Sequence, residues 1–580
     1  MSAELVIGPV LRRVIGTRAT VWVETSAPAT VRVAAGSGAG EATTFSVYGH
    51  HYAMVVVEGL PPGAATEYEV FLDDARVWPE PRSPYPPSVI RTREGDGGDQ
   101  PVRLVFGSCR ETTQHATPRK LPPDALDAYA RRLMAGAEPA PDLLVLLGDQ
   151  VYADIPSPAV KRFLQKVRHK DHSHPENQVV TYEEYTQLYL ESWRDPEIRW
   201  LFATVPSAMI FDDHEIIDDW NSSVSWRREV REQPWWPERI SSGLASYWVY
   251  QHLGNLDPDQ IAADPVYQKV MAAAGDATEV LRDFGAAVGD LADAARRFAG
   301  PRSDERRPEG HEADGAPGYQ WSYALDLGRT RLVVLDNRCS RVLDHDQRAM
   351  LPPGEWAWFA DLARGDFDHL VVGSSLPWLL PPGIHHLEAW NERLAGSSRP
   401  RVAAFAERQR RALDLEHWAA FQRSFDALAA LFAEVGSAGA ASVSVLSGDV
   451  HHSYVARAEF VGAFRRVAGP RRGEKRPVAA PVHQLTCSPV HNQLQSYMRP
   501  VLRLGWWKGP SAVARAVARA TRIAAPAVRW RKLAGPYFGN AVSTLVHEGR
   551  SARVVIEGTT TGGDLREVAA VDLTPTGSTR

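Results

Sequence analysis

Residues 142–152 read DLLVLLGDQVY, and this stretch decides the class of fold. A continuous apolar run ends here in a glycine and the carboxylate of Asp149. Runs of this kind are typical of strands that are buried on both faces of a parallel sheet. Ligands of such sheets bind beyond the carboxyl ends of the strands. The stretch therefore predicts an α/β protein in which Asp149 lies at the edge of the sheet.

Five other apolar runs end in a similar way. One Asp after a strand is commonplace, because Asp starts turns and caps helices. Five of the six runs, however, deliver a carboxylate or a thiol, and the carboxyl ends of parallel strands meet at one edge. We therefore expect a shared site at that edge. The other runs are VRLVFGS before Cys109, SAMIF before Asp212, RLVVL before Asp336, DHLVVG before Ser374 and SVSVLSG before Asp449.

The acidic stretch FDDHEIIDDWN, at residues 211–221, contains four aspartates and a glutamate around one histidine. Like charges this close repel one another, and their uncompensated burial is costly, so we expect a bound cation. Asp213 and His214 are adjacent and point in different directions, so Asp213 can hold a metal while His214 faces a substrate. We interpret Asp218 and Asp219 as the start of a helix or a solvated loop.

Two short motifs supply further candidate metal ligands. GDQVY places Tyr152 three residues after Asp149, close enough for both oxygens to reach one ion. SGDVHH places Asp449 and His451 two residues apart, and hence on one side of an extended segment, with His452 on the other side. Carboxylates, an imidazole, a phenolate and a thiolate together suit a transition metal, and the phenolate favours a highly charged ion.

The length of 580 residues predicts two or more domains. Short alternating strand patterns fill residues 1–95 and predict a small all-β sandwich. The Gly-rich link at 94–101 predicts a boundary between a β-sandwich domain, residues 1–97, and a catalytic domain, residues 98–580. A surface insertion is expected near 299–318.

The composition sets broad limits on the class of protein. Apolar residues make up 44% of the chain and charged residues 23%, with a formal net charge of −5, and no nucleic-acid partner is evident. The three cysteines are far apart and odd in number, which argues against a disulfide framework. No stretch approaches the roughly 18 apolar residues of a transmembrane segment. The oligomeric state is left open.

A basic segment at residues 499–532 contains nine Lys or Arg and no acidic residue. We expect this segment to be helical. It could form a lid over an anionic substrate. A solvated helix face and a helix that lies on a membrane surface are the alternatives.

The order GSC, GDQVY, DDHE and SGDVH resembles alkaline phosphatase D, the PhoD-like branch of the metallophosphoesterases. The resemblance implies an αββα metallophosphoesterase sandwich that follows an N-terminal all-β sandwich. The wider superfamily uses the motifs DxG, GDxxY, GNH(D/E), VxxH and GHxH. Secreted PhoD proteins carry a twin-arginine export signal, which we do not find here. We therefore expect a cytoplasmic protein, with secretion as the family alternative.

The resemblance also assigns metal ligands, and it implies ferric iron, Fe(3+), and calcium, Ca(2+). The VxxH histidine has no counterpart, because residues 371–375 read VVGSS. This difference favours a hard, oxygen-coordinated second metal such as calcium, with zinc, manganese and magnesium as alternatives. The implied ligands are Cys109, Asp149 as the bridging carboxylate, Tyr152, Asp213, Asp449 and His451.

By this resemblance the protein is a metal-dependent phosphatase that hydrolyses phosphate monoesters by attack of a metal-bound hydroxide. His214 and Arg110 would stabilise charge on the phosphoryl oxygens. Asp212 is either a ligand or an acceptor for His214, and Asn221 would shape the pocket. His452 would either support a ligand or contact the phosphate.

Two other functions stay open at this point. One is a phosphodiesterase or phospholipase with the same bimetal site, since the basic segment would suit a lipid or a polyphosphate. The other is a non-catalytic binding protein, in which the metal site serves only stability. The intact GDQVY, DDHE and GDVH motifs count against the second of these.

Overall fold

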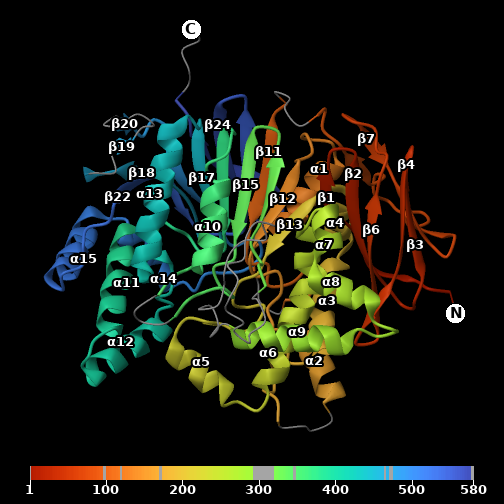
Figure 1. Ribbon diagram of the computed structural model, residues 1–580, viewed down its shortest axis with the longest axis horizontal. Helices are drawn as coiled ribbons and strands as arrows, with labels where there is room; N and C mark the ends of the chain where they lie inside the picture. The colour runs from red at the N-terminus through yellow and green to blue at the C-terminus, as the bar shows by residue number, and fades with distance from the viewer. Residues whose placement is uncertain are drawn as a thin grey trace, which may run out of the picture.

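The computed structural model describes residues 2–575 except 96–99, 118–120, 169–172, 292–318, 344–347, 463–465 and 469–474. The predicted insertion near 299–318 therefore lies outside the described residues. Figure 1 shows two central sheets with helices beside them and the N-terminal strands at one end of the molecule.

The N-terminal region is all-β, as the alternating pattern predicts. Two antiparallel four-stranded sheets, in the orders β1-β2-β6-β5 and β4-β3-β8-β9, pack around a common core that contains Val21, Val31 and Val55. The domain boundary at residue 97 stays a prediction. The strands are β1 (Leu5–Ile15), β2 (Arg18–Thr25), β3 (Thr30–Ala35), β4 (Gly38–Thr43), β5 (Phe45–Val47), β6 (His50–Val57), β7 (Ala65–Glu67), β8 (Glu69–Leu72), β9 (Ala75–Trp78) and β10 (Val89–Arg91).

The first central sheet has six strands in the order β13-β12-β11-β23-β24-β25. Its strands β11, β12 and β13 run parallel, so their carboxyl ends share one edge. The C-terminal strands complete the sheet in antiparallel fashion. The strands are β11 (Val102–Gly107), β12 (Leu143–Leu147), β13 (Ser207–Ile210), β23 (Ala541–Glu548), β24 (Ser551–Thr559) and β25 (Leu565–Asp572).

The second central sheet has seven strands in the order β14-β15-β16-β17-β21-β18-β22. Its strands β15, β16, β17 and β21 are parallel. All six apolar runs singled out in the sequence thus form parallel strands. The strands are β14 (Tyr323–Leu327), β15 (Thr330–Leu335), β16 (His369–Ser374), β17 (Ser442–Ser447), β18 (Ser453–Phe460), β21 (Val482–Thr486) and β22 (Val528–Tyr537); β19 (Arg466–Ala468) pairs with β20 (Lys475–Pro477).

Alternate residues of the second sheet face two different cores. Leu332 and Val334 of β15 belong to the core that also contains β11, β12 and β13, whereas Val333 and Leu335 pack with Phe425 and other residues of helix α13. This alternation follows from the strand geometry, in which successive side chains point to opposite faces. The mixed α/β class with an all-β N-terminal region is confirmed, whereas the αββα metallophosphoesterase assignment stays a prediction.

The helices flank the sheets, and several begin at a side chain that caps the first turn. Helix α3, for example, begins with a capping box in which Thr181 and Glu184 satisfy each other's backbone N–H groups. No helix among the described residues has the length and apolar character to cross a membrane. The helices are α1 (Ala125–Met134), α2 (Pro158–Val167), α3 (Tyr182–Trp193), α4 (Pro196–Thr204), α5 (Val224–Arg231), α6 (Trp236–Tyr247), α7 (Pro258–Ala263), α8 (Pro265–Ala272), α9 (Thr278–Leu291), α10 (Pro353–Leu362), α11 (Pro382–Ala395), α12 (Pro400–Ala412), α13 (Gln422–Ala438), α14 (Met498–Gly505) and α15 (Lys508–Ala520).

The basic segment at 499–532 is helical only in part. Helices α14 and α15 end at Ala520, and the last basic residues belong to strand β22, which pairs with β18. The helical prediction for this last part was wrong. Pro526 lacks the N–H that a continued helix needs, and pairing with a sheet edge offers the following residues backbone hydrogen bonds.

Candidate metal centre

The carboxyl ends of the two sets of parallel strands meet through short loops. The backbone N–H of Cys109 donates to the carbonyl of Gly148 at 3.1 Å, and the N–H of Asp449 donates to Ser108 Oγ at 3.2 Å. Gly448 makes this approach possible, because a Cβ there would lie 2.1 Å from Ser108 Oγ. The glycine before Asp449 is therefore required by the close contact between the two sheets.

Several of the predicted ligands have an unusual backbone. Cys109, Asp149, Asp449 and His451 all adopt the left-handed conformation, with φ between 47° and 64°. Such a conformation costs a non-glycine residue about 1–3 kcal/mol and is retained where the surrounding structure enforces it. The strand ends thus bend sharply where the predicted ligands lie. The segment Asp449–His451 is therefore not extended, and the sequence argument that placed both side chains on one side was wrong.

Four buried or partly buried aspartates form a carboxylate cluster: Asp149, Asp212, Asp213 and Asp449. Each offers an oxygen, and these oxygens lie within 4.8 Å of one another. A second group combines Asp149 and Asp213 with a ring nitrogen of His214 within the same limit. Asp149 and Asp213 are shared by both groups. The bridging role of Asp149 stays a prediction, and its membership of both groups is compatible with it.

The carboxylate cluster needs positive charge. Burial, reinforced by neighbouring negative charge, raises the pKa of Asp149 and of Asp213 well above the usual range. Two buried carboxylate oxygens, Asp149 Oδ1 and Asp212 Oδ2, have no hydrogen-bond partner within the described part of the chain. An unpaired buried acceptor is costly, so these oxygens are suited to coordinate a cation. The oxygen-rich donor set fits a hard ion such as calcium, and the nearby thiol and phenol fit ferric iron.

Arg338 is a protein cation beside this cluster. Its Nε donates to Asp212, its Nη2 lies 3.4 Å from Asp213 Oδ2, and its Nη1 donates to Glu416 at 2.5 Å. One guanidinium that is shared among three carboxylates does not neutralise the four aspartates. The sequence left Asp212 as either a metal ligand or a hydrogen-bond acceptor for His214. The structure does not support the second role, since Asp212 pairs with Arg338 instead.

His214 is held by a residue that the sequence analysis missed. Its Nδ1 lies 2.9 Å from Asp154 Oδ2, and its ring stacks on Tyr152 with 4.3 Å between the ring centroids. Burial opposes the charged imidazole, but the charge of Asp154 and its hydrogen bond raise the pKa of His214 well above the usual range. This environment favours the protonated imidazole, in which Nε2 also carries a proton. That proton can be donated into the site.

Tyr152 and Cys109 both contact Asp149. Tyr152 OH lies 3.4 Å and Cys109 Sγ 3.2 Å from Asp149 Oδ2. Asn492 Nδ2 donates to the phenol oxygen at 2.9 Å, and Ser488 Oγ donates to the sulfur at 3.3 Å. Burial raises the pKa of Cys109 to about 12 and that of Tyr152 well above its usual range, so both are protonated unless a cation replaces the proton.

Asp449 is oriented by a histidine that the sequence analysis also missed. His417 Nε2 lies 2.9 Å from Asp449 Oδ2, and His417 Nδ1 lies 3.2 Å from Glu388 Oε1. Burial opposes ionisation of Asp449, but the hydrogen bond and charge of His417, with smaller contributions from Arg338 and His451, lower its pKa to about 2. Among the described residues, neither His451 nor Cys109 belongs to the two groups around Asp149.

Arg110 is not brought to the carboxylate cluster. Its Nε donates to Asp124 Oδ2 at 2.8 Å, and its Nη1 donates to Ser192 Oγ at 2.7 Å. Asp124 also caps helix α1, so Arg110 fastens the loop after β11 to that helix. The predicted contact of Arg110 with a phosphoryl group stays a prediction, since Nε and Nη1 serve buried acceptors whereas Nη2 has no hydrogen-bond partner among the described residues.

His452 and Asn221 have supporting positions. His452 Nδ1 bonds to the carbonyl of Val450 at 2.7 Å, and its ring stacks on Tyr454. Burial lowers the pKa of His452 to about 4, so this histidine is neutral. Asn221 Nδ2 donates to the backbone carbonyl of Arg338 at 2.5 Å. Both side chains therefore hold loops in place, and of the two alternatives for His452 the structure favours support.

Sequence signals exist for some of the missed residues. Asp154 follows Tyr152 by two residues, and Arg338 lies two residues beyond the strand-end Asp336. Glu215, the last acid of DDHE, accepts from the N–H groups of Asp149, Gln150 and Asp212 and so ties together the ends of β12 and β13. No motif marks His417 or Glu388, since both lie outside the strand-end loops.

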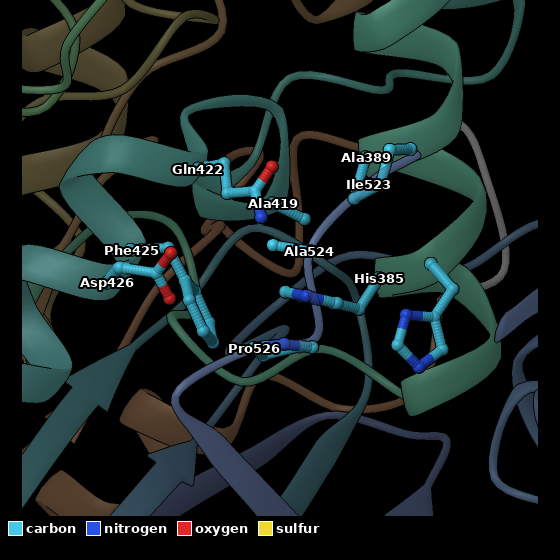
Figure 2. Close-up of a pocket in the computed structure, with 10 residues that line it drawn as sticks. His385, Ala389, Ala419, Gln422, Phe425, Asp426, Ile523, Ala524 and Pro526 are labelled. Atoms are coloured by element: carbon cyan, nitrogen blue, oxygen red, sulfur yellow. The ribbon is translucent and has the colours of Figure 1, made fainter. Parts of the chain in front are cut away.

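A small cavity lies elsewhere in the molecule. His385, Phe425 and Ile523 are among its lining residues, and Figure 2 shows His385 on one helix and Phe425 on another, with Ala524 and Pro526 of the link to β22 beside them. None of the strand-end residues lines it. The cavity is therefore no part of the candidate metal centre.

Two parts of the chain match models of known protein families. Residues 106–295 match the family model described as PhoD-like phosphatase. The chain carries a PhoD-like phosphatase domain. The matched residues include Cys109, Asp149 and Asp213, whereas Asp449 lies beyond them. Residues 2–90 match a model that is described only as a domain of unknown function, DUF7800. No curated protein matches the sequence significantly.

A solved structure of PhoD resembles the whole chain. It shares 11% sequence identity, and the alignment covers 98% of this chain and 92% of PhoD with a TM-score of 0.55. At this identity the likeness shows the fold alone. A maltogenic amylase from S. marinus (9% identity, covering 98% and 82% of the two chains) and a type III pullulan hydrolase from Thermococcus kodakarensis (11%, covering 96% and 94%) give TM-scores of 0.12 and 0.14, which carry no argument.

Proposed function

We propose that this protein is a metal-dependent phosphatase that hydrolyses phosphate monoesters at the carboxylate cluster. One observation carries the proposal. Asp149 is buried, has an oxygen without a hydrogen-bond partner among the described residues, and belongs to both groups of potential ligands. The PhoD-like phosphatase match over residues 106–295 supports the reaction class.

The metal pair that fits best is Fe(3+) with Ca(2+). Cys109, Tyr152 and Asp149 would hold the iron, because a thiolate and a phenolate favour it. Asp213, Asp449 and Asp149 offer the oxygens that calcium prefers. When bound, the two ions would lower the pKa of a water molecule and neutralise charge on the phosphate.

The residues of the chain supply orientation and a proton. Asp154 fixes the His214 ring through Nδ1, which leaves the Nε2 proton for a phosphoryl oxygen or for the leaving oxygen of the ester. His214 also stacks on Tyr152, so its ring cannot rotate freely. Arg338, which is completely buried, fixes Asp212 and Asp213 before the substrate arrives. The site is thus arranged in advance for charge that develops on phosphorus-bound oxygens.

Hydrolysis of p-nitrophenyl phosphate and of bis-p-nitrophenyl phosphate tests the proposal. We expect faster turnover of the monoester, and loss of that activity after a chelator removes calcium. Faster turnover of the diester would favour the phosphodiesterase or phospholipase alternative. No turnover of either ester by metal-loaded protein would contradict the proposal and leave the non-catalytic alternative.

A further inference from the structure

The basic helix pair, α14 and α15, carries an unusual concentration of exposed apolar side chains. Of the 14 large apolar residues that are exposed among the described residues, six lie between Tyr497 and Val517. Trp507 is 60% exposed and Val513 65% exposed. An exposed apolar surface of this kind usually marks a site of interaction.

The spacing places these side chains on one side of each helix. Tyr497 (which precedes α14), Val501 and Leu504 are separated by four and three residues, which is the period of a helical face, and Trp507 lies in the link between the two helices. Val513 and Val517 repeat the spacing on α15. The neighbouring faces of the two helices hold Leu502, Gly505, Ala514 and Ala518, which are buried against the protein.

The helix pair also carries positive charge. The helix pair contains five Lys or Arg, and in the part of the chain that the structure describes none of them forms an ion pair with a carboxylate. Arg499 and Arg503 lie over the ring of Phe538 at 5.9 and 5.1 Å. The cations are Arg499, Arg503, Lys508, Arg515 and Arg519. The helix pair therefore combines unpaired positive charge with exposed apolar groups.

The helix pair is firmly attached to the rest of the molecule. A Cβ added to Gly383 of α11 would lie 3.2 Å from Gly505, and one added to Gly505 would lie 2.9 Å from Pro381 Cβ. Within the pair, Ser511 Oγ donates to the carbonyl of Gly505 at 2.9 Å. Beyond α15, Ile523 and Ala524 line the cavity beside His385, as part of the link to β22 (Figure 2). Figure 1 shows α15 at the outer edge of the molecule, beside α11.

We propose that the basic helix pair docks on a membrane surface that contains anionic lipids. Apolar side chains would enter the boundary between headgroups and acyl chains, and the cations would pair with lipid phosphates. With 13 residues, α15 is too short to span a bilayer, which needs about 20. The helices therefore lie on the surface.

Charge and exposure together favour a membrane over two other occupants. A nucleic acid would bind the cations, but its phosphate backbone gives no role to the exposed Val501, Leu504 and Val513. A second copy of this chain would bring the same positive charge to the interface, and like charges repel. Only an anionic surface with an apolar layer beneath it matches both features. The proposal does not depend on phosphatase activity.

Sedimentation with vesicles tests the proposal on the full chain. We expect binding to vesicles of phosphatidylcholine and phosphatidylglycerol in equal parts, and weak binding to phosphatidylcholine alone. Joint replacement of Val501, Leu504 and Trp507 by Ser should weaken binding about tenfold or more, since it removes the apolar contact. Arg515→Gln with Arg519→Gln should lose about fivefold per charge, and only on anionic vesicles.

A matched control changes exposed apolar residues elsewhere. Met271→Ser with Phe405→Ser removes side chains that are 41% and 45% exposed, and it should leave vesicle binding unchanged. Thermal unfolding of every variant establishes that it is folded. The proposal is overturned if the wild type does not bind anionic vesicles, or if the helix-pair variants bind as the control does. It is equally overturned if those variants affect only DNA binding, or only dimer formation measured by light scattering.

Discussion

His214 depends on Asp154 for both its charge and its orientation. The hydrogen bond between His214 Nδ1 and Asp154 leaves one proton, on Nε2, directed away from that pair. His214→Ala should therefore lower kcat for p-nitrophenyl phosphate by about 10²–10³, the usual effect of losing one transition-state donor. Asp154→Asn should also lower kcat, but by a smaller factor, because the His214 ring stays stacked on Tyr152.

Metal content distinguishes a proton donor from a ligand at this position. His214→Ala should keep its metal near the wild-type ratio, measured by elemental analysis. Asp361→Asn is a suitable control, since Asp361 of α10 is 86% exposed and pairs with Arg364 at 4.0 Å, and it should change neither kcat nor metal content. If His214→Ala lost its metal, His214 would be a ligand and the division of roles between Asp213 and His214 would be wrong.

Cys109 and Tyr152 allow the iron assignment to be tested by absorption spectroscopy. A thiolate or phenolate bound to ferric iron absorbs visible light by charge transfer, so iron-replete protein should be coloured. Tyr152→Phe removes only the oxygen and should weaken or shift the band, and Cys109→Ser should shift it separately. Absorption spectra of the wild type and both variants provide the measurement. A spectrum that is the same in all three would contradict the assignment.

At the residue scale, sequence reasoning found the strand-end groups and missed their partners. Asp149 and Asp213 were predictable because each follows an apolar strand. His417 was not predictable, because it comes from a loop between helices and reaches Asp449 only through the tertiary fold. Arg110 was assigned to the substrate because it adjoins Cys109, but its guanidinium turns toward Asp124.

At the scale of elements, one histidine joins the N-terminal strands to a helix. His50 of β6 bonds to Glu24 of β2 at 2.9 Å and to Glu183 in the first turn of α3 at 2.8 Å. Burial alone would lower its pKa, but the hydrogen bonds to Glu183 and Glu24 outweigh this effect and raise the pKa to about 9. The charged imidazole thus helps to fix α3 against the strands.

This contact gives a stability that depends on pH. The folded pKa lies above the value of about 6.5 for an unfolded chain, so the stabilisation is complete below about pH 6.5 and is lost as the pH rises through about 9. His50→Gln should lower the free energy of unfolding by about 1 kcal/mol near pH 6 and by less near pH 10. Thermal unfolding at both values measures the difference.

The neighbouring His51 is the control for that experiment. Its Nδ1 bonds to Ser46 Oγ at 2.7 Å, and burial lowers its pKa. The effect of His51→Gln on the free energy of unfolding should therefore not become smaller between pH 6 and pH 10. An equal cost of His50→Gln at both values would contradict the role of the charged imidazole.

Element prediction succeeded where the pattern was continuous and failed where backbone conformation decided the outcome. The six apolar runs are strands, since buried strands have an unmistakable composition. The extended reading of Asp449–His451 failed, because the chain adopts left-handed conformations there that no residue type announces. The last part of the basic segment became β22 because β18 offered a free edge, which is a tertiary property.

At the scale of the whole molecule, the site exists because two sheets bring their strand ends together. Asp149 and Asp213 follow strands of the first sheet, and Asp449 follows a strand of the second. The order of the motifs indicated a shared site, but the pairing of the sheets, through contacts such as that of Gly448 with Ser108, was known only from the structure. A substitution of Asp149 should therefore impair both the binding of metal and the activity of the shared site.

The metal content and activity of Asp149→Asn test the central claim most directly. Asp127→Asn is the matched control, since Asp127 belongs to a separate acidic group with Asp195 and Glu197. We expect about two metal ions per chain in the wild type and in Asp127→Asn. Asp149→Asn should lose both ions, together with turnover of p-nitrophenyl phosphate. A folded Asp149→Asn protein that keeps its metal and its activity would contradict the account.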